Sequence, residues 1–159
     1  EEIKKLQFEI KELFVGKLTE PENLHLTLKF LGELPDEQVE SVKNSLHSLD
    51  LSNFEAELDE VGVFSEQFIR IIWVKFEGVK IQELIDKALV ELFEKENSFM
   101  SHVTIARVKR VEDKEKLLNT LNNIKVKNLK FKVNKFYLKK SELSSKGPVY
   151  TTIEEYELK

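Results

Sequence analysis

Two of the three histidines in this chain are each followed, two residues later, by a threonine. His25 and Thr27 lie in "NLHLTLKFLGEL", and His102 and Thr104 lie in "MSHVTIARVKRV", 77 residues further along. A single histidine and threonine at this spacing is usually incidental. Two copies in matching apolar, strand-like runs are not expected by chance, and they indicate a shared function.

A spacing of two on a strand places the imidazole and the hydroxyl on the same face. Because imidazole titrates near pH 6.5, one ring can be neutral and the other protonated, which supplies a general base and a general acid. Threonine hydroxyls can donate hydrogen bonds to an anionic oxygen. The combination suits displacement at phosphorus, whereas the lack of a G-x-S-x-G motif argues against serine-type acyl transfer. We therefore expect the catalytic residues to be His25, Thr27, His102 and Thr104.

The apolar periodicity predicts the elements that position these side chains. We expect helices at 3–14, 39–49, 81–93 and 117–124, and strands at 24–30, 54–64, 69–78, 102–108, 129–140 and 150–158. Each motif strand is thus followed by a helix and a strand pair, so one strand, helix, strand, strand unit occurs twice.

This repeat predicts an α+β protein with a bilobal, pseudo-twofold fold. We expect two antiparallel sheets facing a central cleft, with helices outside and the two motif strands opposite each other across the groove. The chain would form a single bilobal domain, 1–159, whose lobe-forming repeats cover about 20–78 and 98–159 and are linked by a helix at 80–95.

Composition narrows the function further. The chain has no cysteine, which excludes disulfides, thiolate zinc sites and cysteine nucleophiles. No apolar run is long enough for a membrane span, so we expect a cytoplasmic protein without a membrane partner. The formal net charge of -4 argues against coating of long nucleic acid and favours contact in a local cleft. A lysine-rich run from Lys125 to Lys146 is either a solvated strand face or a substrate-facing surface.

Several blocks of the sequence resemble one known family. The blocks "HLTLKFLGEL", "GVFSEQFIRIIWVKF", "HVTIAR" and "GPVYTTIEEYEL" together resemble the 2H phosphoesterase superfamily. The likeness is closest to the archaeal and bacterial RNA 2′,3′-cyclic phosphodiesterases long labelled 2′-5′ RNA ligases, and it covers nearly the whole chain. It implies the 2H phosphoesterase fold, no metal and no cofactor.

The resemblance also implies a reaction and a substrate. The reaction is hydrolysis of RNA 2′,3′-cyclic phosphate ends to 2′-phosphomonoesters, with reversible 2′-5′ ligation in some members. The implied partner is RNA with such an end, either tRNA fragments or small cyclic nucleotides, and we expect a monomer. A non-catalytic RNA- or nucleotide-binding module using the same cleft is the alternative, although a binder would not need a matched acid and base.

Carried over by position, the resemblance gives His25 the role of acid toward the departing 3′ oxygen and His102 the role of base toward water. The sequence alone leaves this assignment open. The two threonines would hold the phosphate. Arg107 matches the arginine that closes the second motif, but strict alternation turns it away from His102, so its substrate role requires the strand to end or bulge there.

Two further residues are candidate substrate contacts. Lys29 shares the predicted His25 face and could steady the phosphate, although a solvated strand lysine is equally consistent with the pattern. Phe68 lies beside the predicted loop between two strands and could stack on a nucleobase.

Two features depart from the family pattern. Relatives begin with a short apolar strand before the "EEIKK" helix. That strand is absent from this sequence, so the first sheet is expected to lack a strand. Ser101 precedes the second histidine where relatives commonly have proline.

Overall fold

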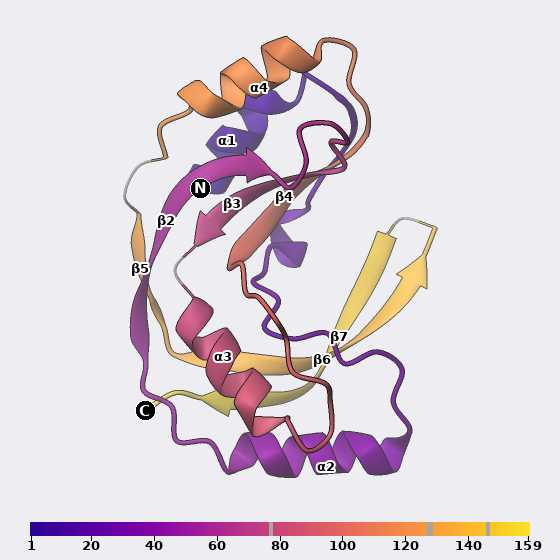
Figure 1. The fold of residues 1–159 in the computed structure, drawn as a ribbon, viewed down its shortest axis with the longest axis vertical. Helices are drawn as coiled ribbons and strands as arrows, with labels where there is room; N and C mark the ends of the chain where they lie inside the picture. The colour runs from indigo at the N-terminus through magenta and orange to yellow at the C-terminus, as the bar shows by residue number, and fades with distance from the viewer. Residues whose placement is uncertain (77, 127–128, 146) are drawn as a thin grey trace. The chain divides into compact units, whose positions relative to one another are not determined.

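Helices are interspersed with strands along the chain in a computed structural model, which describes residues 1–76, 78–126, 129–145 and 147–159 (Figure 1). The elements are α1 (Glu2–Ile10), β1 (Val15–Leu18), the 3₁₀-helix η1 (Pro21–Asn23), α2 (Asp36–His47), β2 (Phe54–Val63), β3 (Ile71–Phe76), α3 (Val79–Ala88), β4 (His102–Arg110), α4 (Lys114–Asn123), β5 (Lys130–Val133), β6 (Lys135–Ser144) and β7 (Gly147–Glu157).

The strands form a five-stranded sheet with the order β1-β4-β3-β2-β5 and a two-stranded sheet, β6-β7. The pairings of β1 with β4, β4 with β3, β3 with β2 and β6 with β7 are antiparallel. The predicted α+β class with two antiparallel sheets is therefore confirmed.

The chain divides into two compact units, each assembled from three segments. The first unit comprises Glu1–Thr27, Ala56–Val79 and Met100–Lys130, and the second comprises Leu28–Glu55, Lys80–Phe99 and Phe131–Lys159. This division differs from the expected lobes at 20–78 and 98–159. The reason is that β4 pairs with β3 and not with the strands that follow it in the sequence. Both histidine motifs consequently belong to the first unit.

The first unit is held together by an apolar layer between its helices and its sheet. Helix α1 packs against both α4 and β4, and the two helices bury residues at a spacing of four, which places them on one helical face. Leu6 and Ile10 of α1, and Leu117 and Leu121 of α4, are buried in this way. On β4 the buried residues include Ile105 and Val108.

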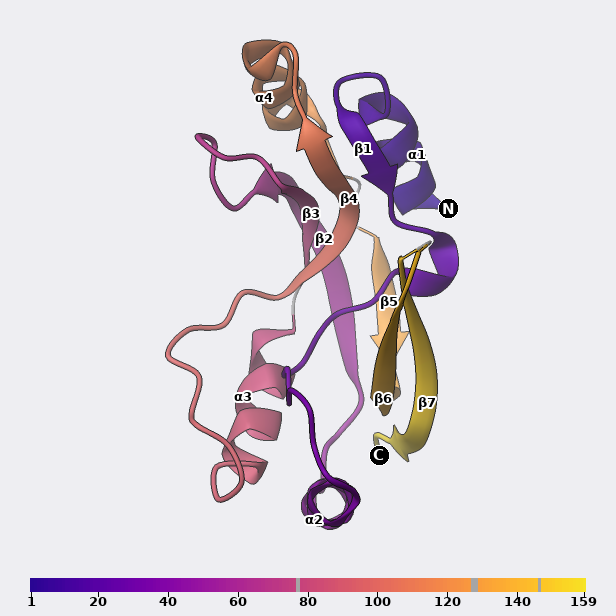
Figure 2. The ribbon, with the colours of Figure 1, turned by 90° about the vertical axis from the view of Figure 1, so that its right-hand side faces the viewer.

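The second unit has its own core. Buried residues from α2, α3 and the β6–β7 hairpin form one cluster, and the hairpin contributes two stacked rings, Phe136 and Tyr156, with centroids 4.8 Å apart. Figure 2 shows the hairpin as a twisted ribbon, as expected for a sheet with two strands among the described residues.

The structure corrects three of the predicted elements. The strand expected at 24–30 is reduced to one bridge, between Leu26 and Val103. The first helix ends at Ile10, and Val15–Leu18 forms an edge strand on β4 that its own pattern did not predict. The strand expected at 129–140 is interrupted at Asn134, whose carbonyl accepts a hydrogen bond from the Leu158 amide at 2.7 Å.

Candidate active site

The two histidine motifs lie side by side in the first unit, joined by an antiparallel bridge between Leu26 and Val103. Antiparallel pairing about this bridge sets each histidine across from the threonine of the other motif. Val103 is buried, with 7% of its surface exposed. The residues on either side of the bridge therefore point to the opposite face, and His25, Thr27, His102 and Thr104 share it. The expected position of the motif strands, opposite each other across a groove, is corrected by this pairing.

Both imidazoles are held in the same way by their own backbone. Nδ1 of His25 lies 2.6 Å from the carbonyl oxygen of Asn23, and Nδ1 of His102 lies 2.8 Å from the carbonyl oxygen of Met100. A carbonyl can only accept, so in each ring Nδ1–H is the donor. Nε2 is then the ring nitrogen able to exchange a proton, and it is the same atom in both copies of the motif.

An aromatic layer supports the second histidine. The ring of Phe64 meets that of His102 at 87°, with centroids 4.9 Å apart, and it meets the Trp73 ring at 5.9 Å. Trp73 in turn lies over Gly62, where a Cβ would approach the indole to 2.5 Å, so this position requires glycine. Sequence reasoning did not single out Phe64 as a contact of His102. Its contact with His102 arises from the fold and has no local sequence signal.

Arg107 joins the face of the two histidines and two threonines because β4 contains a bulge. Ile72 pairs with Ala106 and Trp73 pairs with Thr104, so Ile105 is an extra residue on β4. Ile105 and Ala106 are both fully buried, as expected where a bulge interrupts the alternation of faces. Beyond the bulge, Arg107 is exposed and lies on the face of His102 and Thr104. The bulge on which a substrate role for Arg107 depends is therefore present.

A buried glutamine holds this bulge in place. Gln7 on α1 is 6% exposed, and its Nε2 donates to the carbonyls of Ile105, at 2.9 Å, and Thr19, at 2.8 Å. The amide of Thr19 also donates to the Ile105 carbonyl at 2.9 Å. The carbonyl of the bulged residue, Ile105, thus accepts hydrogen bonds from both the Gln7 side chain and the Thr19 amide, which stabilises the bulge. Sequence reasoning did not identify Gln7.

Lys29 does not share the exposure of His25. It belongs to the second unit, where its side chain is 3% exposed and its Nζ lies 2.6 Å from Oδ1 of Asp86 and 3.0 Å from the carbonyl of Glu94. The hydrogen bond from Lys29 lowers the pKa of Asp86. The alternative of a solvated strand lysine is wrong, and because the ammonium is buried and paired we do not include Lys29 among the phosphate contacts.

The remaining candidates lie at exposed positions. Phe68, in the loop between β2 and β3, is 70% exposed. Within the lysine-rich run, Lys127 and Lys146 lie outside the described residues. Lys135 pairs with Glu155 and Lys140 with Glu142 on the surface of the second unit. These two lysines have surface partners, as a solvated strand face predicts.

The arrangement of the first unit can support acid and base chemistry at an anion. Two Nε2 atoms, two hydroxyls and one guanidinium share a face. Among the described residues, no group of three or more histidine, aspartate or glutamate side chains is placed to hold a metal ion. Within the same residues, none of the helices has the length and apolar character that crossing a membrane requires.

Comparison with known proteins identifies the family. The profile of the LigT like Phosphoesterase family matches residues 1–73 and 79–150. An RNA 2′,3′-cyclic phosphodiesterase of Methanocaldococcus jannaschii is 35% identical, and the alignment covers 98% of this chain and 92% of that protein. An enzyme of the same name from Methanothermobacter thermautotrophicus is 32% identical, with 89% of this chain and 82% of that protein covered.

Solved structures agree with the sequence comparison. The crystal structure of TT0787 of Thermus thermophilus has a TM-score of 0.81 and 29% identity, covering 98% of this chain and 89% of that chain. The structure of Escherichia coli LigT complexed with 3′-AMP has a TM-score of 0.74 over 99% of this chain and 91% of that chain, at 18% identity, and so supports the fold alone. With a family profile that spans nearly the whole chain, this protein belongs to the LigT-like phosphoesterases of the 2H superfamily, as its two histidine motifs predict.

Proposed function

We propose that this chain hydrolyses the 2′,3′-cyclic phosphate end of RNA to a 2′-phosphomonoester, using two histidines and no metal. The observation that carries the proposal is the matched geometry of the histidines, each of which donates Nδ1–H to a carbonyl two residues before it. Names of relatives that are 35% and 32% identical over most of the chain support the same activity.

The proposed reaction begins at water. Nε2 of His102 takes a proton from the water while the water oxygen forms a bond to phosphorus. The bond from phosphorus to the 3′ oxygen breaks, and Nε2 of protonated His25 gives its proton to that oxygen. The products are a 2′-phosphomonoester and a free 3′ hydroxyl. Proton exchange with solvent then returns both imidazoles to their starting states.

The other residues of the shared face stabilise the charge that develops at phosphorus. The hydroxyls of Thr27 and Thr104 donate to the non-bridging oxygens, and such preorganised donors contribute most in the transition state. Arg107, turned to this face by the bulge, adds a positive charge and the forked donor geometry that suits a phosphate.

The matched histidines also favour an enzyme over the binding-module alternative. A module that only binds phosphate needs donors, which the threonines and Arg107 supply, and has no need of two Nε2 atoms fixed by equivalent backbone contacts. Reversible 2′-5′ ligation would use the same residues in the opposite direction.

We propose that the protein acts as a monomer in the cytoplasm.

The direct test is incubation of the purified chain, in EDTA, with a short RNA that ends in a 2′,3′-cyclic phosphate. The expected result is a 2′-phosphate product, resolved from the 3′-phosphate isomer, that is lost in His102→Ala. Binding of this RNA without any turnover would contradict hydrolysis and support the binding-module alternative. Loss of activity in EDTA, restored by a divalent cation, would contradict the metal-independent mechanism.

A further inference from the structure

The loop between β2 and β3 carries an exposed aromatic ring in a fixed position. The loop begins at Phe64, which contacts His102, and it is closed by a hydrogen bond from the Phe68 amide to Oγ of Ser65 at 3.2 Å. The Phe68 side chain is 70% exposed. A single exposed apolar side chain is common on protein surfaces, so the inference depends on the groups that surround this ring.

Arg70 fixes this ring from one side. Its Cζ lies 5.0 Å from the centroid of Phe68, and its Nη1 donates to the carbonyl of Lys109 on β4 at 3.2 Å. The carbonyl of Arg70 also accepts from the Val108 amide at 2.8 Å. The guanidinium is therefore held between the ring and β4. These contacts hold the Phe68 ring and the Arg70 guanidinium next to each other before any ligand binds.

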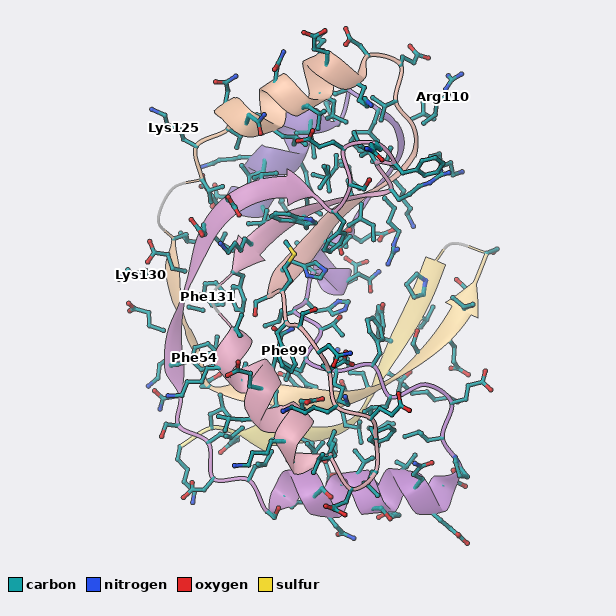
Figure 3. All side chains as sticks on the ribbon, viewed as in Figure 1. Phe54, Phe99, Arg110, Lys125, Lys130 and Phe131 are labelled. Atoms are coloured by element: carbon teal, nitrogen blue, oxygen red, sulfur yellow. The ribbon has the colours of Figure 1, made fainter. Side chains whose placement is uncertain are left out.

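The segments next to Phe68 and Arg70 are rich in basic residues, although the chain as a whole is negatively charged. Three exposed basic residues follow one another closely on β4, namely Arg107, Lys109 and Arg110. Arg110 projects from the end of the strand, where it pairs with Glu112 at 2.8 Å (Figure 3). The acids in the loop and in the segment after the strand are Glu66, Glu112 and Asp113. With Arg70 these segments carry four cations and three acids, whereas the chain as a whole has a formal net charge of -4.

We propose that Phe68, Arg70 and Lys109 form a docking surface for single-stranded RNA, which binds the nucleotides that precede the reacting end. The inference rests on the proposed function, and it adds a binding site for nucleotides that lie outside the reacting end. A base stacks on the outer face of Phe68, and the neighbouring phosphates lie against Arg70 and Lys109. Stacking on an aromatic plane beside a row of cations is the usual way in which proteins hold single strands.

The position of the surface along β4 explains why it serves preceding nucleotides. On β3, which carries no extra residue, Arg70 is five residues from Lys75, the partner of His102. At about 3.3 Å per residue this corresponds to roughly 16 Å along the strand. Successive phosphates in a stacked strand are only about 3.4 Å apart along its axis. A mononucleotide bound at the histidines therefore does not reach Phe68, whereas a chain of several nucleotides does.

The chain offers a matched control for this surface. Phe8 on α1 is 69% exposed, and Lys11 lies over its ring at 4.3 Å. This second aromatic and cation pair has nearly the same exposure as Phe68 and belongs to the same unit. Phe8 lies on a helix and outside the proposed path of the RNA. The Phe8→Ala variant therefore measures the general effect on activity of removing an exposed phenylalanine.

The test compares Phe68→Ala, Phe68→Trp and Phe8→Ala on two substrates, an RNA octamer ending in a 2′,3′-cyclic phosphate and the mononucleotide 2′,3′-cyclic AMP. Stacking of one base is worth about 1 to 3 kcal/mol. Phe68→Ala should therefore lower kcat/KM for the octamer by roughly 5- to 150-fold and leave the mononucleotide rate unchanged. Phe68→Trp should keep the octamer rate, and Phe8→Ala should alter neither. An equal loss on both substrates, or no loss on the octamer, would overturn the proposal.

A binding measurement separates this inference from the proposed function. Fluorescence anisotropy with a labelled octamer ending in a 2′-phosphate needs no turnover. If the wild-type chain cleaves neither substrate but Phe68→Ala still weakens octamer binding, the hydrolysis proposal fails and the docking surface stands. If the wild-type chain cleaves both substrates and Phe68→Ala binds the octamer as tightly as wild type, the docking surface fails alone. Arg70→Ala and Lys109→Ala should each reduce the salt dependence of binding, and an unchanged slope in both would contradict phosphate contact.

Discussion

Leu26 and Val103 face each other in a single antiparallel bridge, and this one contact brings together residues that are far apart in the sequence. Because side chains alternate along both segments, the bridge points its own two residues inward and the four histidine and threonine side chains outward. The two motifs are therefore related by a local twofold arrangement within one unit.

Replacing either histidine tests the proposed chemistry most directly. His25→Ala and His102→Ala should each lower kcat by about 10² to 10⁴, the range expected for loss of a general acid or base. Because both groups act in one displacement, the double variant should be little worse than either single variant. Thermal unfolding should be nearly unchanged. Single variants that keep wild-type kcat on the cyclic substrate would exclude this mechanism.

The threonine hydroxyls are tested by removing oxygen while keeping shape. Thr27→Val and Thr104→Val should each reduce kcat by about 10- to 10³-fold, as loss of one transition-state donor does in other enzymes. Thr→Ser at the same positions keeps the hydroxyl and should restore most of the activity. A serine variant as impaired as the valine variant would indicate that the methyl group, and not the hydroxyl, is what matters.

Phe64 should act by positioning His102, since its ring stands against the imidazole at 4.9 Å. Phe64→Leu is expected to lower kcat about 10-fold on 2′,3′-cyclic AMP with little change in KM, because the base would lose its fixed orientation. Phe68→Leu, in the same loop but without this contact, is the matched control and should leave mononucleotide turnover unchanged. A rise in KM with constant kcat would instead place Phe64 in substrate binding.

Gln7 connects the first helix to the bulge that turns Arg107 toward the site. Gln7→Leu removes one buried and one partly buried hydrogen bond to backbone carbonyls and should lower the free energy of unfolding by about 1 to 3 kcal/mol. It should also raise KM, since Arg107 would be held less well. Arg107→Gln, measured beside it, should raise KM without loss of stability. Full stability in Gln7→Leu, measured by urea unfolding, would contradict this role.

The ion pair between Lys29 and Asp86 should make a pH-dependent contribution to stability. Hydrogen bonding from Lys29 holds the pKa of Asp86 below its ordinary value of 3.8. The contribution is therefore fully present above that value and is lost as the pH falls through the lower pKa of the folded state. Asp86→Asn should cost about 3 kcal/mol at pH 7, because it leaves the Lys29 charge buried without its partner.

The matched control for this pair is Glu96→Gln. Glu96 also approaches Lys29, at 3.5 Å, but its side chain is 48% exposed, so its loss should cost less than about 1 kcal/mol. Urea unfolding at pH 7 and at pH 3 and below should show the Asp86→Asn difference shrinking with acid. A difference that does not depend on pH would mean that packing, and not the ion pair, is responsible.

The candidate site residues could be named from the sequence because their signal is local. Imidazole and hydroxyl two residues apart in an apolar run define both the face they share and the chemistry they can perform, and neither depends on the rest of the chain. The hairpin of β2 and β3 and the helices α2 and α4 were predicted for the same reason, since short-range periodicity specifies them. Their ends moved by a few residues in the structure.

The features that depend on pairing between distant segments could be seen only in the tertiary structure. The bridge at Leu26, the extra residue at Ile105 and the edge strand at Val15–Leu18 are all set by the register of β4 against its neighbours. Register depends on both strands of a pair, so it cannot be predicted from the sequence of one strand alone. For the same reason the sequence placed Lys29 beside His25 on a regular strand, whereas the fold ends that alternation after the bridge and buries the lysine against Asp86. The sequence by itself determined which groups could act on a phosphate, and the pairing of strands decided which of them share one face.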